Sequence, residues 1–252
     1  MVANVFNVSI FWADTIRDIR SDNLDRIWNK SILQSFEEYV QAHCQWNEDA
    51  KAAFPYQLTH LTSDDRLNEK SISAAEYHKY RGFWSGSLWN KHRSAIISLN
   101  HALLERLAVA KSNAVNMDFT TTNMIDELHH KATVTIQTMI RDIFASIPFC
   151  LGDIPPYTSV SPQCKSSATG PPKSVGGYLL IWPLIVILHC PIASETQRDQ
   201  ARAALIRIGR QFGIVSAIKW GQNYTTTAED ALLPDARIDV LPDSFNRYML
   251  GQ

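Results

Sequence analysis

Apolar residues recur every three or four positions along most of this chain, which is the spacing of one face of an α-helix. The first such stripe follows Asp22, a residue type that caps helices, and consists of Trp28, Ile32, Phe36, Tyr39 and His43. The second consists of Leu88, His92, Ala95, Leu99, Leu103 and Arg106. The third begins near Asn123, contains Leu128, Ala132, Ile136, Ile140, Ile143 and Ile147, and is expected to end at Pro148. No strand pattern of any length is found, so the stripes predict an all-α fold.

An apolar run occupies Tyr178–Cys190, directly after Gly176 and Gly177. A helix that is hydrophobic on every side belongs in the interior, so this run is expected at the centre of a helical bundle. Pro183 predicts a kink or a break within it, and the glycine pair is expected to let the chain turn sharply into the helix. The run has 13 residues, too few to span a bilayer, which takes about 20.

The helix that follows is marked at both ends. Ser194, with Gln197 three positions later, forms a capping-box pattern, and Gly213 is placed to end the helix in a left-handed turn. Its apolar stripe consists of Ala201, Leu205, Ile208 and Phe212. Gly209 lies opposite that stripe and is expected to admit a close neighbour. A shorter helix is expected from Ile214 to about Trp220.

Residues 151–175 interrupt the helical pattern with prolines and serines, which predicts a long surface loop. The last segment, residues 230–252, is mostly polar and is expected to be a tail. A length of 252 residues suits one large domain or two small ones, and residues 1–252 are expected to form a single irregular multi-helix domain.

Charge and cysteine usage narrow the function classes. The formal net charge is −1, and the longest basic cluster is Lys91-His92-Arg93, so direct binding to nucleic acid is not expected. Cysteines 44, 150, 164 and 190 are scattered without the spacing of a zinc site and are expected to be free thiols. We therefore expect no metal, no cofactor and no membrane insertion.

Four short segments carry a resemblance to a known family. They are Trp89–Arg93 (WNKHR), Asp142–Gly152 (DIFASIPFCLG), Gly176–Leu184 (GGYLLIWPL) and Ile206–Ile214 (IRIGRQFGI). In this order they resemble the C-terminal part of the fungal-specific transcription factor domain, the helical regulatory region of zinc binuclear cluster regulators. The zinc cluster of that family, six cysteines among lysines and arginines, has no counterpart in this sequence.

The resemblance implies a regulatory protein of fungal type that acts in transcription, for example of secondary metabolism, without its own DNA-binding module. It implies a nuclear or cytoplasmic protein that works through a protein partner, either a full-length regulator or a second copy, or that senses a small apolar effector. Enzymatic activity is the less favoured interpretation.

Several groups of polar residues are candidate sites. Asp64, Asp65, Asn68 and Glu69 resemble the magnesium motif of helical terpene cyclases, so the alternative function is a helical enzyme acting on an isoprenoid-like metabolite; a solvated helix start capped by Ser63 is favoured. Adjacent helical residues point about 100° apart, so His129 and His130 do not converge on a metal. A surface hydrogen bond between Asp126 and one of these histidines is expected instead, with Glu127 beside it.

Two further pairs are expected to be structural. His189 with Cys190 is interpreted as a core histidine beside a buried thiol. Arg93 and Asp142 each lie beside an apolar stripe, and each is expected to satisfy a buried partner, one candidate being the other. The sequence thus predicts no catalytic, cofactor-binding or metal-binding residue.

Overall fold

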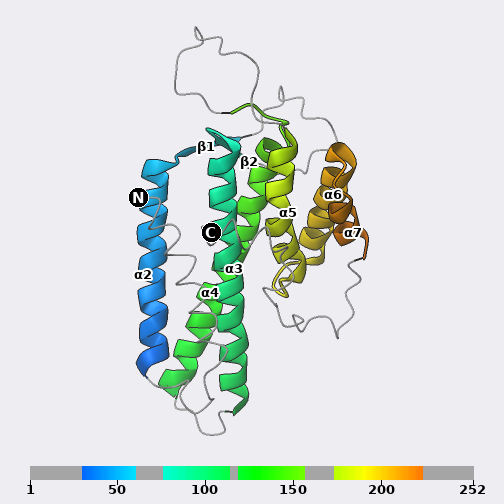
Figure 1. Ribbon diagram of the computed structural model, residues 1–252. Coiled ribbons are helices and arrows are strands. Elements are labelled where there is room, and N and C mark those ends of the chain that lie inside the picture. Colours follow the sequence, from blue (N-terminus) through cyan, green and yellow to red (C-terminus); the bar gives the residue numbers. More distant parts are fainter. Residues whose placement is uncertain (1–29, 61–75, 114–118, 157–172, 224–252) are drawn as a thin grey trace, which may run out of the picture.

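The computed structural model describes residues 30–60, 76–113, 119–156 and 173–223. These residues form six helices and one two-stranded sheet (Figure 1). The elements are α2 (Lys30–Ala53), β1 (Tyr56–His60), β2 (Glu76–Tyr80), α3 (Phe83–Asn113), α4 (Phe119–Cys150), α5 (Lys173–His189), α6 (Glu195–Phe212) and α7 (Val215–Asn223). The described part of the chain is mostly helical, which confirms the predicted all-α fold.

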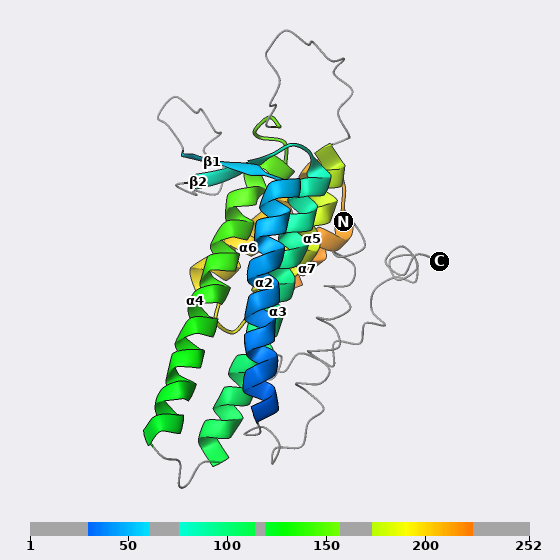
Figure 2. The same ribbon diagram turned by 90° about the vertical axis from the view of Figure 1, so that its left-hand side faces the viewer.

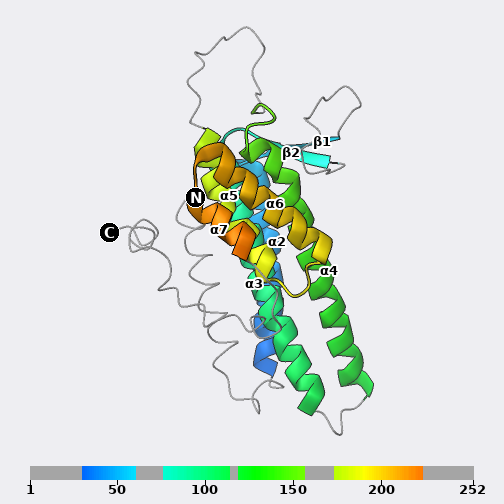
Figure 3. The ribbon, with the colours of Figure 1, turned by 90° about the vertical axis from the view of Figure 1, so that its right-hand side faces the viewer.

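The three long helices α2, α3 and α4 lie side by side and alternate in direction, and the hairpin crosses one end of them (Figures 1 and 2). On the other side of α3, α5 packs against α3, α4 and α6, and α7 packs against α6 (Figure 3). The interior of this arrangement is lined by isoleucines of α4, among them Ile136, Ile140 and Ile143, which are fully buried. Their spacing is that of the third predicted stripe.

The predicted place of α5 is only partly right. Leu180, Leu184 and Ile187 are fully buried against its neighbours, but Tyr178 and Trp182 are 56% and 51% exposed. Helix α5 therefore has one open side. Helix α3 buries polar side chains as well as apolar ones. These polar residues are Ser87, Asn90, His92, Arg93, Ser94, Asn100 and His101.

The expectation that the chain contains no strand is wrong. Strands β1 and β2 are antiparallel, and their register pairs Tyr56 with Tyr80 and His60 with Glu76. Each strand has five residues, and in β2 both Tyr77 and His78 are buried although they are adjacent. Packing of β2 on α4 from one side overrides the simple alternation that sequence reasoning looks for.

Helix ends agree with the sequence where capping chemistry is present. Ser194 Oγ accepts a hydrogen bond from the Gln197 backbone N–H, and the Gln197 side chain accepts one from the Ser194 N–H, so the capping box is confirmed. Gly213 has a φ of 73°, the predicted left-handed end. Prolines are poorer markers of the helix ends. Pro148 lies inside α4, which ends at Cys150, and Pro183 lies inside α5.

Other predicted bounds shift or cannot be compared. Helix α3 begins at Phe83, five residues before Leu88, and α5 begins at Lys173, inside the predicted loop of 151–175. Helix α7 extends to Asn223. Asp22, Trp28, residues 157–172 of the loop and the tail of 230–252 lie outside the described residues.

Glycines set how closely the helices approach. Gly176 and Gly177 do not form the expected turn, since both lie inside α5. A Cβ on Gly176 would collide with the Cys150 carbonyl oxygen, and one on Gly177 would lie 2.5 Å from the Phe212 ring. The pair therefore provides space, not a bend. The close neighbour expected at Gly209 is confirmed, because Ile218 of α7 occupies the space where its Cβ would be.

Candidate functional site

The residue that departs most from the ordinary interior of a helical protein is Arg93, a charged side chain that is only 2% exposed. Its Nη1 donates to the Tyr80 hydroxyl at 2.7 Å and to the Asn90 Oδ1 at 2.9 Å. Its Nη2 lies 3.3 Å from His78 Nδ1, which must accept because a guanidinium only donates. These partners come from β2 and α3, and we call Arg93, His78, Tyr80 and Asn90 the arginine cluster.

Aromatic rings enclose the same guanidinium. The Arg93 Cζ lies 5.6 Å from the centre of the Tyr56 ring and 5.5 Å from that of Trp89, within the range of cation–π attraction. The Trp89 Nε1 donates to the Phe54 carbonyl oxygen at 2.9 Å. The chain leaving α2, strand β1 and the start of α3 are thereby fixed around one charge.

Helix α4 closes the cluster from the other side. Asn90 Nδ2 donates to Ser146 Oγ at 2.7 Å, and Ser146 Oγ donates to the Ile143 carbonyl oxygen at 2.6 Å. Cys150 Sγ lies 3.9 Å from the same amide nitrogen. Asn90 thus uses its amide oxygen for Arg93 and its amide nitrogen for α4, which joins the two helices through buried hydrogen bonds.

Burial determines the protonation states of these groups. Burial opposes the charge of Arg93, but Tyr80 and Asp142 favour it, and the net effect raises the pKa of Arg93. Burial, aided by the positive charges of Arg93 and Arg141, lowers the pKa of His78 to about 2. Burial also raises the pKa of Tyr80, and it raises the pKa of Cys150 to about 12.

The cluster therefore contains one permanent cation and neutral acceptors near neutral pH. A general acid or base needs a pKa near the working pH, and a cysteine nucleophile needs its thiolate. Neither His78 nor Cys150 meets that requirement. The arrangement is suited to fixing the hairpin, α3 and α4 relative to one another.

The expected pairing of Arg93 with Asp142 is not a direct contact. The hydrogen-bonding partners of Arg93 are Tyr80, Asn90 and His78, whereas the Asp142 carboxylate lies 3.4 Å from Arg141 Nη2. Asp142 acts on Arg93 through space and raises its pKa. Arg93 does satisfy buried partners, as expected, but they are neutral ones.

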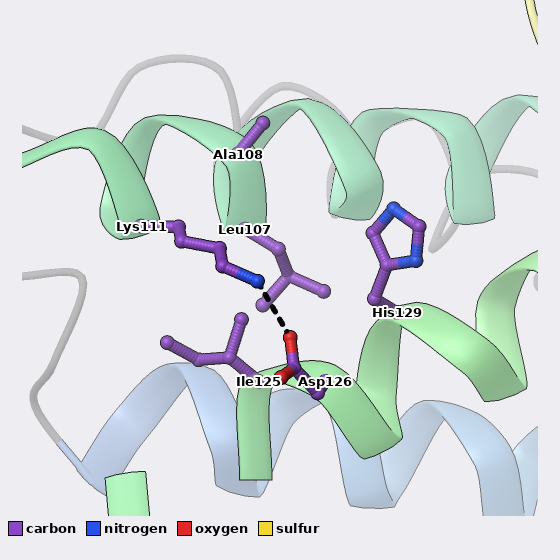
Figure 4. A pocket seen from close by; sticks show the side chains of 6 residues that line it. All are labelled: Leu107, Ala108, Lys111, Ile125, Asp126 and His129. Carbon is purple, nitrogen blue, oxygen red and sulfur yellow. Dashed lines mark hydrogen bonds and ion pairs between the residues drawn. The ribbon is translucent and has the colours of Figure 1, made fainter. Parts of the chain in front are cut away.

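The acidic and histidine residues at the other end of α3 and α4 form a different kind of contact. Asp126 was expected to bond to His129 or His130. It pairs instead with Lys111 of α3 at 2.8 Å. Figure 4 shows this ion pair among the side chains that line a pocket between α3 and α4, with His129 also in the lining. Both histidines are exposed, and Glu127 pairs with Lys131.

His189 and Cys190 lie where the apolar run ends. Cys190 is buried, and burial raises the pKa of its thiol, as expected for a structural cysteine. His189 is half-buried, and its ring meets that of Trp220 edge to face at 5.8 Å. The magnesium-motif candidates Asp64, Asp65, Asn68 and Glu69, with Ser63, lie outside the described residues.

The four resemblance segments contact one another in series. Asn90 of the first bonds to Ser146 of the second, and the Cys150 carbonyl of the second packs on Gly176 of the third. Gly177 of the third packs on Phe212 of the fourth.

A partly buried ion pair adds a second link to the fourth segment. Arg207 binds Asp153, directly after the second segment, through two hydrogen bonds of 2.9 and 2.5 Å. The four segments thus form a continuous packing unit.

Two members of the arginine cluster were missed by sequence reasoning. His78 and Tyr80 belong to Glu76-Tyr77-His78-Lys79-Tyr80, a segment that looks polar because two of its five residues are charged. The signal that could have found them is three buried-type rings among those five residues. Their partner, Arg93, comes 13 to 15 residues later and is not indicated by any local pattern.

Within the part of the chain that the structure describes, no group of three or more His, Cys, Asp or Glu side chains could hold a metal ion. None of the described helices is both long and apolar enough to cross a membrane.

Comparison with known proteins finds a relative whose function is recorded. Over 139 residues the chain is 25% identical to the transcription factor dbaG of Emericella nidulans, a stretch that covers 54% of this chain. The chain spans about a third (32%) of that protein's length. No family model matches the sequence, and no solved structure matches it. The chain is thus a distant relative of a fungal transcription factor over about half its length.

Proposed function

We propose that this chain is a regulatory protein of the fungal transcription factor type that acts through protein contacts and not through a reaction of its own. The distant similarity to dbaG carries this proposal, because it links the chain to transcription. The series of contacts among the four resemblance segments supports it, because they build a scaffold around Arg93 whose buried groups have pKa values unsuited to catalysis. Because transcription takes place in the nucleus, the proposed place of action is the nucleus.

The proposed partner is a full-length regulator or a second copy of the chain, and the chain does not bind DNA itself. The net charge of −1 supports the second point, since affinity for DNA comes largely from cationic side chains that displace counterions. A small apolar effector is a further element of the proposal. The magnesium motif behind the alternative enzyme function lies outside the described residues, and that alternative stays a prediction.

Tethering the chain to a promoter tests the proposal. The 252-residue chain is fused to a heterologous DNA-binding module, and transcription of a reporter is compared with that given by the module alone. We expect transcription to rise or fall clearly, since the fusion brings the chain and its protein partner to the promoter. The variant Arg93→Met, which removes the centre of the cluster, should lose the effect, whereas Lys111→Met at an exposed ion pair should keep it. A folded, accumulated fusion that leaves transcription unchanged would contradict the proposal.

Direct DNA binding is tested separately with the purified chain at physiological salt. We expect no binding above that of a protein of similar charge, because the chain has no basic surplus to neutralise phosphates. Tight, sequence-selective binding would show that the chain reads DNA itself and that the partner part of the proposal is wrong.

A further inference from the structure

The described part of α2 is attached to α3 by an aromatic contact that includes two histidines. His43 Nδ1 of α2 lies 3.0 Å from His92 Nε2 of α3, and the ring centres are 5.0 Å apart. Trp46, one turn further along α2, stacks on the His92 ring with 3.5 Å between centres. The edge of Trp46 also meets Trp89 at 5.2 Å. His92 therefore contacts both α2 residues at once.

The short distance between the two imidazoles defines their protonation. One ring nitrogen must carry a proton and the other must offer a lone pair, so the contact is a single N–H···N hydrogen bond. Both rings can be neutral in this arrangement. When each ring carries two protons, no lone pair remains, and two positive charges face each other at this distance.

The surroundings of the pair disfavour added protons. Burial lowers the pKa of His43. Burial, then the neighbouring His43 and Arg93, lowers the pKa of His92 well below its usual value. The groups that act on His92 are thus His43 from α2 and Arg93 from its own helix, both of which carry or gain positive charge. At neutral pH the rings are neutral, and acid forces charge into a site that resists it.

We propose that the His43–His92 contact is an acid-sensitive connection, which holds α2 on α3 while at least one ring is neutral and releases α2 when both are protonated. Release uncovers the rings of Trp46 and Trp89, which α2 and α3 bury against each other. The inference rests on this contact alone and is independent of the proposed role in transcription.

Hydrogen–deuterium exchange of the full chain tests the inference. Exchange is measured between about pH 7.5 and about pH 5 and corrected for the intrinsic pH dependence of amide exchange, with peptides that cover residues 41–53 of α2. We expect protection of these peptides to fall by about tenfold or more over this range, and to fall further than that of peptides from α4 and α6. Unchanged protection of residues 41–53 at the lower pH would overturn the proposal.

Two variants separate this contact from general acid unfolding. The double variant His43→Phe/His92→Phe keeps ring packing and removes both partners of the hydrogen bond, so residues 41–53 should stay protected at either pH. The matched control His130→Asn, an exposed histidine of α4, should keep the wild-type response. Equal loss of protection in the double variant and in the wild type would overturn the proposal.

If the double variant does not fold, a measurement on the unaltered chain still tests the proposal. The ring C–H signals of the histidines are followed by NMR across the same pH range. We expect the signals of His43 and His92 to titrate together, with pKa values below the usual 6.5. The titration should fall at the pH where residues 41–53 lose protection. Titration of both rings without loss of protection would contradict the inference.

Discussion

The two ends of the α3–α4 pair hold positive charge in opposite ways. Near the hairpin, Arg93 is 2% exposed and is bound by the neutral groups of Tyr80, Asn90 and His78. At the far end, Lys111 pairs with Asp126, and their side chains are 60% and 57% exposed. Judged by formal charge alone, the Lys111–Asp126 pair would be expected to stabilise the fold more than the contacts of Arg93 with neutral groups. Solvent reverses that order, because water screens the exposed pair and cannot replace the partners of the buried cation.

Replacing the buried cation is expected to have the largest effect. Arg93→Met should lower the free energy of unfolding by about 3 to 5 kcal/mol, since Tyr80, Asn90 and His78 each lose a hydrogen-bonding partner in the interior. Urea unfolding followed by circular dichroism measures the change. Arg93→Lys keeps the charge but not the planar guanidinium. Its free energy of unfolding should lie between those of Arg93→Met and the wild type. A loss below about 1 kcal/mol would mean that the arginine cluster does not fix the hairpin, α3 and α4 relative to one another.

Acidification is expected to weaken the hairpin end next. The pKa of His78 is about 2 in the folded protein, against a usual 6.5, so below pH 6.5 the unfolded chain takes up a proton that the folded one refuses. Stability should therefore fall as pH falls, by up to about 1.4 kcal/mol per pH unit from this ring.

The slope is measured by urea unfolding at several pH values. Measurement in the His43→Phe/His92→Phe background removes the contribution of the His43–His92 pair. A stability that stays constant from about pH 6.5 to about pH 4.5 in that background would show that His78 takes up protons in the folded state.

A smaller loss is expected where the cluster meets α4. Ser146→Ala removes the acceptor of Asn90 Nδ2, which keeps only the weak contact with Cys150 Sγ, and should cost about 1 to 2 kcal/mol. Thr133→Ala is the matched control, because its hydroxyl donates to the His129 carbonyl on an exposed part of the same helix. Equal losses for the two variants in urea unfolding would argue that burial does not set the energy of these bonds.

The contrast between these ends also explains what the sequence could predict. The helices, the capping box at Ser194 and the left-handed Gly213 follow from residues close together in the chain. The position of Arg93 beside an apolar stripe was visible as well. Its partners His78 and Tyr80 were not, because they lie on a five-residue strand whose burial depends on packing against α4, which lies beyond α3 in the chain.

Charge was a misleading guide for the same reason. Sequence reasoning offered Asp142 as the partner of Arg93 and a histidine as the partner of Asp126. In the structure Arg93 bonds to neutral groups, and Asp126 reaches across to Lys111 of α3. Nor could the apolar composition of α5 reveal that Tyr178 and Trp182 face outwards, because hydrophobicity alone does not state how many neighbours a helix has.

The smallest effect is expected at the exposed end. Lys111→Met should change the free energy of unfolding by about 0.5 kcal/mol or less, because water screens both side chains and the long lysine gives up conformational freedom to form the pair. A double-mutant cycle with Asp126→Asn measures the coupling free energy of the pair. This coupling should vanish at about 1 M salt, where the Debye screening length is about 3 Å. A coupling as large as the loss caused by Ser146→Ala would mean that geometry, and not burial, decides what a charged contact contributes to the α3–α4 pair.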